Sequence, residues 1–152
     1  MAEFTREDIE RKIAAARDEE KTPRFQKADL RGLDLSEVDL RGVDLSGANL
    51  RGANLYRARL VEADLSEANL RQANLVMADL FGANLIHADA RDASLRGAHA
   101  GQANLGHASL RGADLSEADL GYANLGGADL KGAILEGTNL RGATMPDHTM
   151  YL

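Results

Sequence analysis

The chain lacks residue types on which whole classes of protein depend. Its 152 residues include no cysteine and no tryptophan, two prolines, three phenylalanines and three tyrosines. Without cysteine it can form no disulfide, no thiolate metal site and no cysteine nucleophile, and nothing points to an oxidising compartment. So few aromatic residues are too little for the core of an ordinary globular domain of this size.

Long apolar runs and an excess of positive charge are missing as well. No stretch approaches the roughly 18 apolar residues of a membrane span, and the charged first 30 residues do not resemble a signal peptide, so we expect no membrane span and a cytoplasmic protein. The net charge of −6 argues against direct nucleic-acid binding. The length allows one domain.

What the chain does contain is a repeat of five residues. From Ala28 to Asp147 it divides into 24 blocks of five without an insertion or deletion. The third place of each block is Leu except at Ala90, Ala100 and Met145. The first place is Ala in 20 of the 24 blocks, and the second is mostly Asp or Asn. A pattern this regular predicts one repeating structural unit.

A period of five fits neither a helix nor a flat strand. An α-helix would spread the Leu residues around its surface, and a strand would send successive ones to opposite faces. A chain that bends the same way every five residues keeps every Leu inside, and four bends close a square coil of 20 residues. Small Ala in first place lets the backbone turn near the axis, and Gly, in about half of the fifth places, eases each corner.

Blocks such as ANLRG, ADLSE, ANLGG and ADLKG resemble the pentapeptide-repeat family, whose motif is A(D/N)LXX. The resemblance covers residues 28–147 and implies an all-β fold, a right-handed four-sided (quadrilateral) β-helix solenoid. The 120 residues make about six coils. Coils stacked at about 4.8 Å give a rod about 29 Å long.

The two ends differ in sequence. Thr5 and Asp8 form a capping-box pattern, and residues 6–20 read as a helix that ends before Pro23. We expect this helix to cap the first coil, with partner binding as the other interpretation. The expected organisation is therefore a cap and transition at 1–27, the β-helix at 28–147 and a tail at 148–152.

Residues 20 apart should stack on one face, so outward residues can be grouped into columns. One column is a basic stripe with one cation per coil: Arg31, Arg51, Arg71, Arg91, Arg111 and Lys131. Such neighbours repel by about 1 kcal/mol per pair even in water. The stripe is either a solvated ladder, partly neutralised by nearby acids, or a strip for an anionic partner or membrane surface.

Two further surfaces follow from the same grouping. An acidic face has no cation within the repeats and carries Asp44, Asp64, Glu67 and Asp147. A candidate interaction patch of outward apolar residues lies in two adjacent coils: Tyr56, Val61, Val76, Met77, Phe81 and Ile86. Single exposed apolar residues are common, but six together favour a contact surface.

Residues for catalysis or metal binding are not arranged together. His87 and His107 are 20 apart and should stack, but two ligands make a weak metal site, and we expect no metal. The Gly residues recur at corners and form no phosphate-binding loop. A rod with a filled interior has no pocket, so we expect neither a catalytic residue nor a cofactor.

We therefore interpret the chain as a non-enzymatic rod that serves as a protein-interaction or structural module. The alternative, implied by the resemblance, is a DNA mimic that binds DNA gyrase, as an inhibitor or as protection from quinolones. A consensus-like scaffold without a partner is a third interpretation, against which the irregular blocks argue. The last coil has no helix over it, so we expect a homodimer whose dimer end is formed by Met145, Met150, Tyr151 and Leu152.

Overall fold

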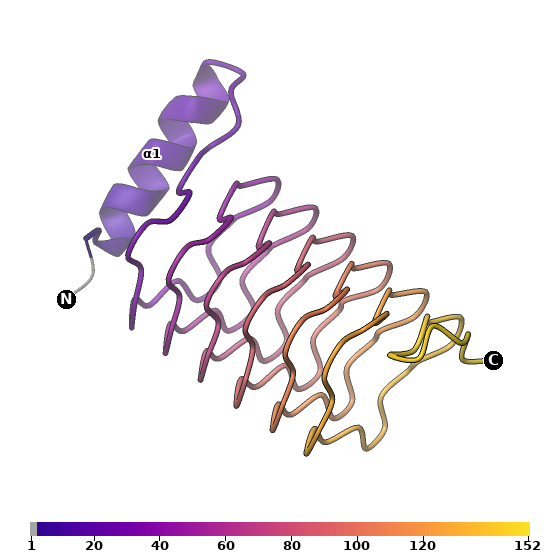
Figure 1. Cartoon of the computed structure of the whole chain (residues 1–152). Coiled ribbons are helices and arrows are strands. Elements are labelled where there is room, and N and C mark those ends of the chain that lie inside the picture. Colours follow the sequence, from indigo (N-terminus) through magenta and orange to yellow (C-terminus); the bar gives the residue numbers. More distant parts are fainter. Residues whose placement is uncertain (1–2) are drawn as a thin grey trace.

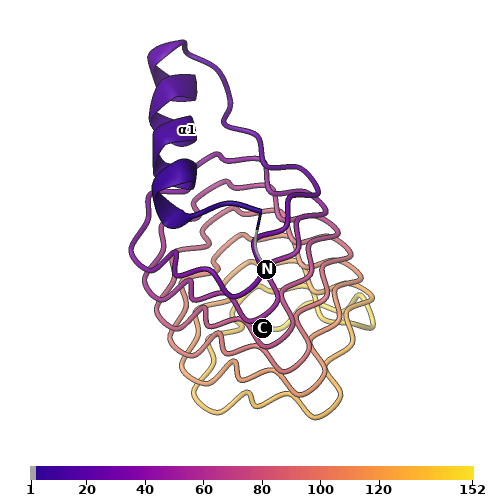
Figure 2. The same ribbon diagram turned by 90° about the vertical axis from the view of Figure 1, so that its left-hand side faces the viewer.

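The computed structural model describes residues 3–152 and shows a four-sided rod. One helix, α1 (Arg6–Asp18), lies at the N-terminal end, and the chain then winds in successive coils to the C-terminus at the other end (Figure 1). Viewed toward the end that carries α1, the coils stack with their corners in register (Figure 2). The stacking places residues 20 apart side by side.

Each side of a coil pairs with the coils before and after it through its second-place residue. The parallel bridges run in steps of 20 from Arg24–Asp44 to Asn124–Thr144. A third-place N–H donates to the next coil, as Leu50 N does to Asn69 O at 2.8 Å, and a second-place N–H donates to the previous coil, as Asn69 N does to Ala48 O at 2.9 Å. The sides are therefore isolated bridges and not long strands.

The corners are β-turns with a positive φ at their second central residue. The first-place N–H closes each turn, as Ala53 N does by donating to Leu50 O at 2.9 Å. All 24 fifth-place residues from Lys27 to Gly142 have φ between 53° and 74°, and Gly occupies only eleven of them. Gly therefore eases the corner as expected, but 13 other residues adopt the same left-handed conformation, which costs about 1 kcal/mol or more each.

The core is a filled column of Leu and Ala. Third-place residues from Leu30 to Leu125 are at most 1% exposed. Ala90 and Ala100 are equally buried, and their backbone N–H groups still donate to the next coil at 2.8 and 2.7 Å. The coil that contains them therefore keeps its spacing from its neighbour although two Leu side chains are missing.

Helix α1 begins with the capping box that the sequence predicts. The Thr5 side chain accepts from Asp8 N at 3.2 Å, and Asp8 accepts from Thr5 N at 2.8 Å. Ile9 and Ile13 are buried against the end of the core. Phe25 joins them and meets the Phe4 ring edge-on at 5.9 Å between centroids.

Pairing between coils begins before residue 28. Asp44 N donates to Pro23 O at 2.9 Å, and Phe25 N donates to Asp44 O at 2.7 Å. The turn around Lys27 has the same positive φ as the later corners. Phe25 thus takes the inward place that Leu holds in the blocks that follow.

The C-terminal tail folds back on its own coil, so the last coil, which has no helix over it, is not bare on every side. Met150 bridges Thr144 in an antiparallel pair. Gly142 N donates to Tyr151 O, and Tyr151 N donates to Ala143 O, both at 2.7 Å. One of the four sides is therefore covered by the tail. The other three sides have no chain beyond them among residues 3–152.

Candidate functional site

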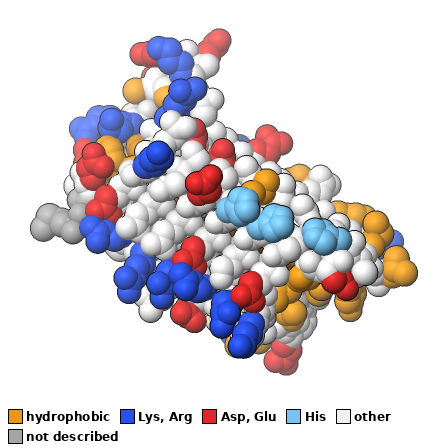
Figure 3. All heavy atoms as spheres, in the orientation of Figure 1, with side chains coloured by type: hydrophobic (Ala, Val, Ile, Leu, Met, Phe, Trp, Pro, Cys, Tyr) orange, Lys and Arg blue, Asp and Glu red, His pale blue; other side chains and the backbone are white. Residues whose placement is uncertain are grey.

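The basic stripe and the histidines lie along two edges of one face (Figure 3). The stacking of second-place residues, such as Asn49 on Asn69 and Asn69 on Asp89, holds the stripe in register. The six cations therefore lie in one column along the rod. Their surroundings differ from coil to coil.

Part of the basic stripe is neutralised within its own blocks. Arg31 donates from Nε and Nη2 to Asp29 at 2.8 and 2.6 Å, and Arg91 does the same to Asp89. Hydrogen bonds from Arg31 hold the pKa of Asp29 down at about 2, and those from Arg91 lower the pKa of Asp89. Arg111 lies 3.3 Å from Asp129. These three arginines are engaged by the chain itself.

Two cations in the middle of the stripe have no such partner. Asn49 and Asn69 precede Arg51 and Arg71 by two residues, and each amide oxygen accepts only the arginine's backbone N–H, at 3.2 and 3.1 Å. Neither guanidinium forms an ion pair within residues 3–152, and Nε of Arg71 is buried without a hydrogen-bond acceptor. Sequence reasoning missed this difference, although the alternation of Asp and Asn carries its signal.

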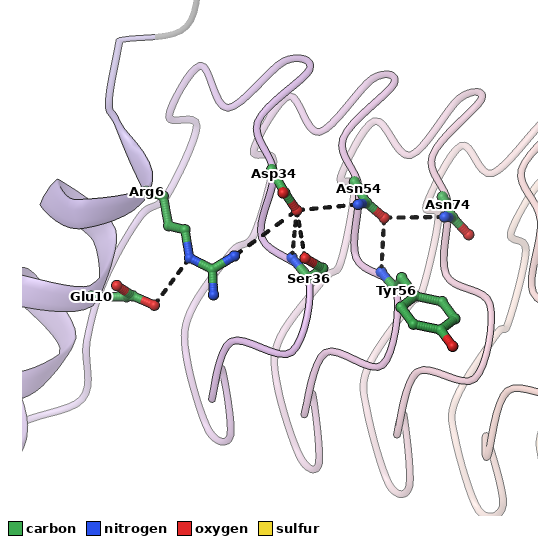
Figure 4. A network of polar contacts seen from close by, with 7 residues as sticks. All are labelled: Arg6, Glu10, Asp34, Ser36, Asn54, Tyr56 and Asn74. Carbon is green, nitrogen blue, oxygen red and sulfur yellow. Dashed lines mark hydrogen bonds and ion pairs between the residues drawn. The ribbon is translucent and has the colours of Figure 1, made fainter.

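Second-place residues also form ladders along the rod. Asn54 Nδ2 donates to Asp34 at 3.1 Å, and Asn74 Nδ2 donates to Asn54 at 3.1 Å (Figure 4). Asp34 also accepts from the backbone and hydroxyl of Ser36, which lower its pKa, and Arg6 of α1 lies 3.9 Å away. This ladder stabilises the surface and ties α1 to the first coils.

The interaction patch is spread over three corners. Met77 and Phe81 are 42% and 44% exposed. The other members are half-buried: Tyr56, Val61, Val76 and Ile86. Tyr56, Val76 and Met77 lie at one corner and Val61 and Phe81 at the next, so these five border one face of the rod. Ile86 lies a corner further and does not share that face.

The acidic face is interrupted. Asp44 and Asp64 pair in adjacent coils, with Glu67 at the neighbouring corner. The following coils place Asn84, Asn104 and Asn124 in the same column. Asp147 lies in the terminal turn, where Thr149 donates to it and lowers its pKa. The face is therefore acidic only in its N-terminal part, and the Lys27 side chain reaches that part beside Gly47.

The two histidines that the sequence places 20 residues apart are stacked. The rings of His87 and His107 lie 5.3 Å apart at 19° to each other. Within residues 3–152 no three side chains of His, Asp or Glu lie near enough to hold a metal ion. The same part of the chain contains no helix long and apolar enough to cross a membrane.

The C-terminal end exposes more apolar surface than the sequence suggested. Met150, Tyr151 and Leu152 are 64%, 49% and 100% exposed, and Met145 is half-buried. Ile134, which occupies a second place that is usually Asp or Asn, is 50% exposed on another side of the last coil. The residues expected at the dimer end thus lie at one end of the rod, and Ile134 joins them.

The surface hollows lie between the corners of neighbouring coils or between α1 and a coil. One of about 500 Å³ is lined by corner residues that include Lys27, Ser46 and Glu67. Another of about 230 Å³ lies between α1 and the coil of Val38. Neither brings together a nucleophile, a base and an oxyanion donor.

The chain has similarity to a known family and to solved structures. The family model described as "Pentapeptide repeats" matches in eight copies, over residues 24–60, 58–97, 91–121 and 108–146. No curated protein matches the chain significantly.

Among solved structures, the pentapeptide repeat protein Rfr23 from the cyanobacterium Cyanothece 51142 is 28% identical over 83% of this chain and 91% of its own, with a TM-score of 0.59. The pentapeptide repeat protein alr5209 from Nostoc Pcc 7120 is 42% identical over 51% of this chain and 64% of its own, with a TM-score of 0.50. QnrB1, a plasmid-mediated fluoroquinolone resistance protein, is 25% identical over 78% of this chain and 65% of its own, with a TM-score of 0.43. The chain belongs to the pentapeptide-repeat family and has its right-handed four-sided β-helix fold.

Proposed function

We propose that this protein is a non-enzymatic rod of about six coils that acts as a structural and protein-interaction module in the cytoplasm, as a homodimer joined at its C-terminal end. The observation that carries the proposal is the difference between the two ends. Helix α1 buries Ile9 and Ile13 on the first coil and acts as its cap. The last coil has the tail on only one side.

The open sides of the last coil present what an interface needs. Backbone N–H groups that donate to a following coil elsewhere, such as those of Leu130 and Leu135, have no backbone acceptor within residues 3–152. Leu130 and Leu135 are only partly buried, and Ile134 is half exposed beside them. Unpaired edges next to apolar side chains favour association, and a two-fold contact hides both ends at once.

A pair of matched variants tests the dimer. Ile134→Asp puts a charge at the open end, and Phe81→Asp puts the same charge on the side of the rod at a similarly exposed residue. We expect the wild type and Phe81→Asp to be dimers by sedimentation at micromolar concentration and Ile134→Asp to be a monomer. A monomeric wild type at high micromolar concentration contradicts the proposal.

The side of the rod is where a protein partner would bind. Met77 and Phe81 are the exposed members of the interaction patch, and each packs over a glycine of the next coil, Gly97 and Gly101, with more than two fifths of its surface still exposed. We expect Phe81→Glu to lose a partner that Ile134→Asp retains. Loss in Ile134→Asp alone would place the partner at the open end and overturn this assignment.

The alternative function, a DNA mimic that binds gyrase, is favoured by one observation. Asp44 and Asp64 lie in adjacent coils with Glu67 close by, so negative charge repeats along the axis. The asparagines that follow in the same column limit that repeat to two coils. The basic stripe on another corner adds positive charge, which a DNA mimic does not need. A supercoiling assay decides: inhibition by the purified protein, relieved by Asp44→Asn with Asp64→Asn, would establish this function instead.

A further inference from the structure

Six of the eight fourth-place arginines have Asp or Asn two positions earlier, and these six fall into two classes. The other two, Arg96 and Arg111, have Ser there and pair with Glu117 and Asp129. Where that residue is Asp, the guanidinium donates twice to it, and this happens at Asp29–Arg31, Asp39–Arg41 and Asp89–Arg91. Where it is Asn, the amide oxygen accepts only the backbone N–H, and this happens at Asn49–Arg51, Asn69–Arg71 and Asn139–Arg141. An amide cannot neutralise a guanidinium, so the second class is left for a partner outside the block.

Two members of the second class are neighbours. The Asn49–Asn69 bridge places Arg51 and Arg71 on adjacent coils, with their backbones about 4.8 Å apart. On either side of them stand Arg31 and Arg91, each neutralised by its own Asp. The unneutralised charge of this part of the stripe is therefore local, two positive charges on two coils.

Arg71 also lacks an acceptor that its surroundings would normally supply. Its Nε is buried and has no hydrogen-bond partner. Asp89 lies close enough for Arg71 to be a minor cause of its lowered pKa, but both Asp89 oxygens are held by Arg91. Because Nε is shielded from solvent, an oxygen supplied from outside would accept from the Nη groups of Arg71, which have no hydrogen-bond partner within residues 3–152 either.

The size and charge of the pair select the ligand. A phosphomonoester dianion matches two positive charges and offers three oxygens, enough to accept from both guanidinium groups. A carboxylate carries one charge and leaves the other unmatched. A nucleic acid or a membrane surface would need a longer free array, and here the neighbouring arginines are already engaged.

We propose that Arg51 and Arg71 form a binding site for a phosphomonoester dianion, free or carried on a partner's side chain. Of the six cations of the basic stripe, this inference assigns anion binding to these two. It goes beyond the interaction module and does not depend on the dimer. Its test uses small anions, so that its failure would leave the proposed function standing.

The direct experiment follows the arginine Nε–H signals of the ¹⁵N-labelled full chain during titration with inorganic phosphate at constant, low ionic strength and pH 7.5. We expect saturable shifts for Arg51 and Arg71, smaller ones for Arg31 and Arg91, and acetate to bind at least about tenfold more weakly. Phosphoserine in place of phosphate identifies the source: tighter binding than phosphate points to a modified side chain, equal binding to free phosphate esters. No saturable shift, or equal affinity for acetate, overturns the proposal.

Three variants separate a site from general attraction by positive charge. Arg51→Gln with Arg71→Gln and the matched control Arg57→Gln with Arg141→Gln each remove two positive charges, and only the first should abolish binding. Arg57 and Arg141 lie on other corners and form no ion pair within residues 3–152, so the control frees no carboxylate. Asn49→Asp with Asn69→Asp keeps both arginines but gives each an internal carboxylate, as in the Asp29 and Asp89 blocks, and should abolish binding too. Equal weakening in the control, or binding retained in the Asp variant, overturns the proposal.

Discussion

The coil that contains Ala90 and Ala100 should become more stable when both are replaced by Leu. These residues are ten apart, on opposite sides of one coil, and both are at most 1% exposed. Their third-place neighbours in the adjacent coils, such as Leu70 and Leu110, are fully buried. The hydrogen bonds from Ala90 and Ala100 to the next coil keep their ordinary 2.8 and 2.7 Å, so this coil keeps its spacing from its neighbour although two Leu side chains are missing.

The expected gain follows from the added carbon atoms. Each Ala→Leu change buries three more carbons at about 0.8 kcal/mol each, or about 2.4 kcal/mol. Fixing the Leu rotamer costs about 0.5–1 kcal/mol, which leaves about 1.5–2 kcal/mol per site and about 3–4 kcal/mol for both. At about 2–4 °C per kcal/mol for a chain of this length, the melting temperature should rise by roughly 6–16 °C.

Calorimetry and urea unfolding of the single and double variants test this prediction. Ala93→Leu is the matched control, because Ala93 is equally buried in the same coil but in the first place, where the backbone turns close to the axis. We expect the control to lose about 1–3 kcal/mol through overpacking. A similar loss for Ala90→Leu with Ala100→Leu would refute the reasoning and show that neighbouring side chains already fill the space.

Three further predictions concern the pH dependence, the corners and the helix. Hydrogen bonds from Arg41 lower the pKa of Asp39, with a contribution from the charge of Arg17 in α1. The stability that this carboxylate contributes is therefore present at neutral pH and lost as the pH falls below about 4. In a plot of melting temperature against pH, Asp39→Asn should make the decline at acid pH less steep. Gly52→Ala should cost about 1 kcal/mol in urea unfolding, because φ is +67° and nothing lies within 4 Å, whereas Gly142→Ala should cost more because the Tyr122 ring occupies the space of the new Cβ. Thr5→Ala should cost about 1 kcal/mol through loss of the helix cap, measured in the same way, and Thr5→Ser should restore most of it.

The core and the corners could be predicted because they repeat within each block. Leu50 points inward for the same reason as Leu55 and Leu60, since each block presents the same order of side chains to the same bend. The corner was predicted less completely. Met77 and His87 adopt the left-handed conformation that Gly favours, because closing the coil requires it at every fifth place.

The candidate sites were predicted as columns, and the structure distinguishes residues within them. The sequence places Arg31 and Arg51 in equivalent positions. Hydrogen bonding to Asp29 neutralises the charge of Arg31, whereas the charge of Arg51 has no such partner. Ile134 was overlooked because its place in the block is usually polar. Its exposure matters only because no coil follows it.

The sequence by itself determined the five-residue bend, the inward Leu and Ala and the columns of outward residues. These features depend on the order of side chains within a block and on the interval of 20 residues between stacked positions. Both repeat along the chain, so a periodic pattern is enough to predict them. Only the tertiary structure decided that the tail covers one side of the last coil through Met150 and Tyr151, that Arg17 of α1 reaches Asp39, and that Nε of Arg71 is buried without an acceptor. These contacts join residues outside the repeat or depend on side-chain rotamers, so no periodic pattern encodes them.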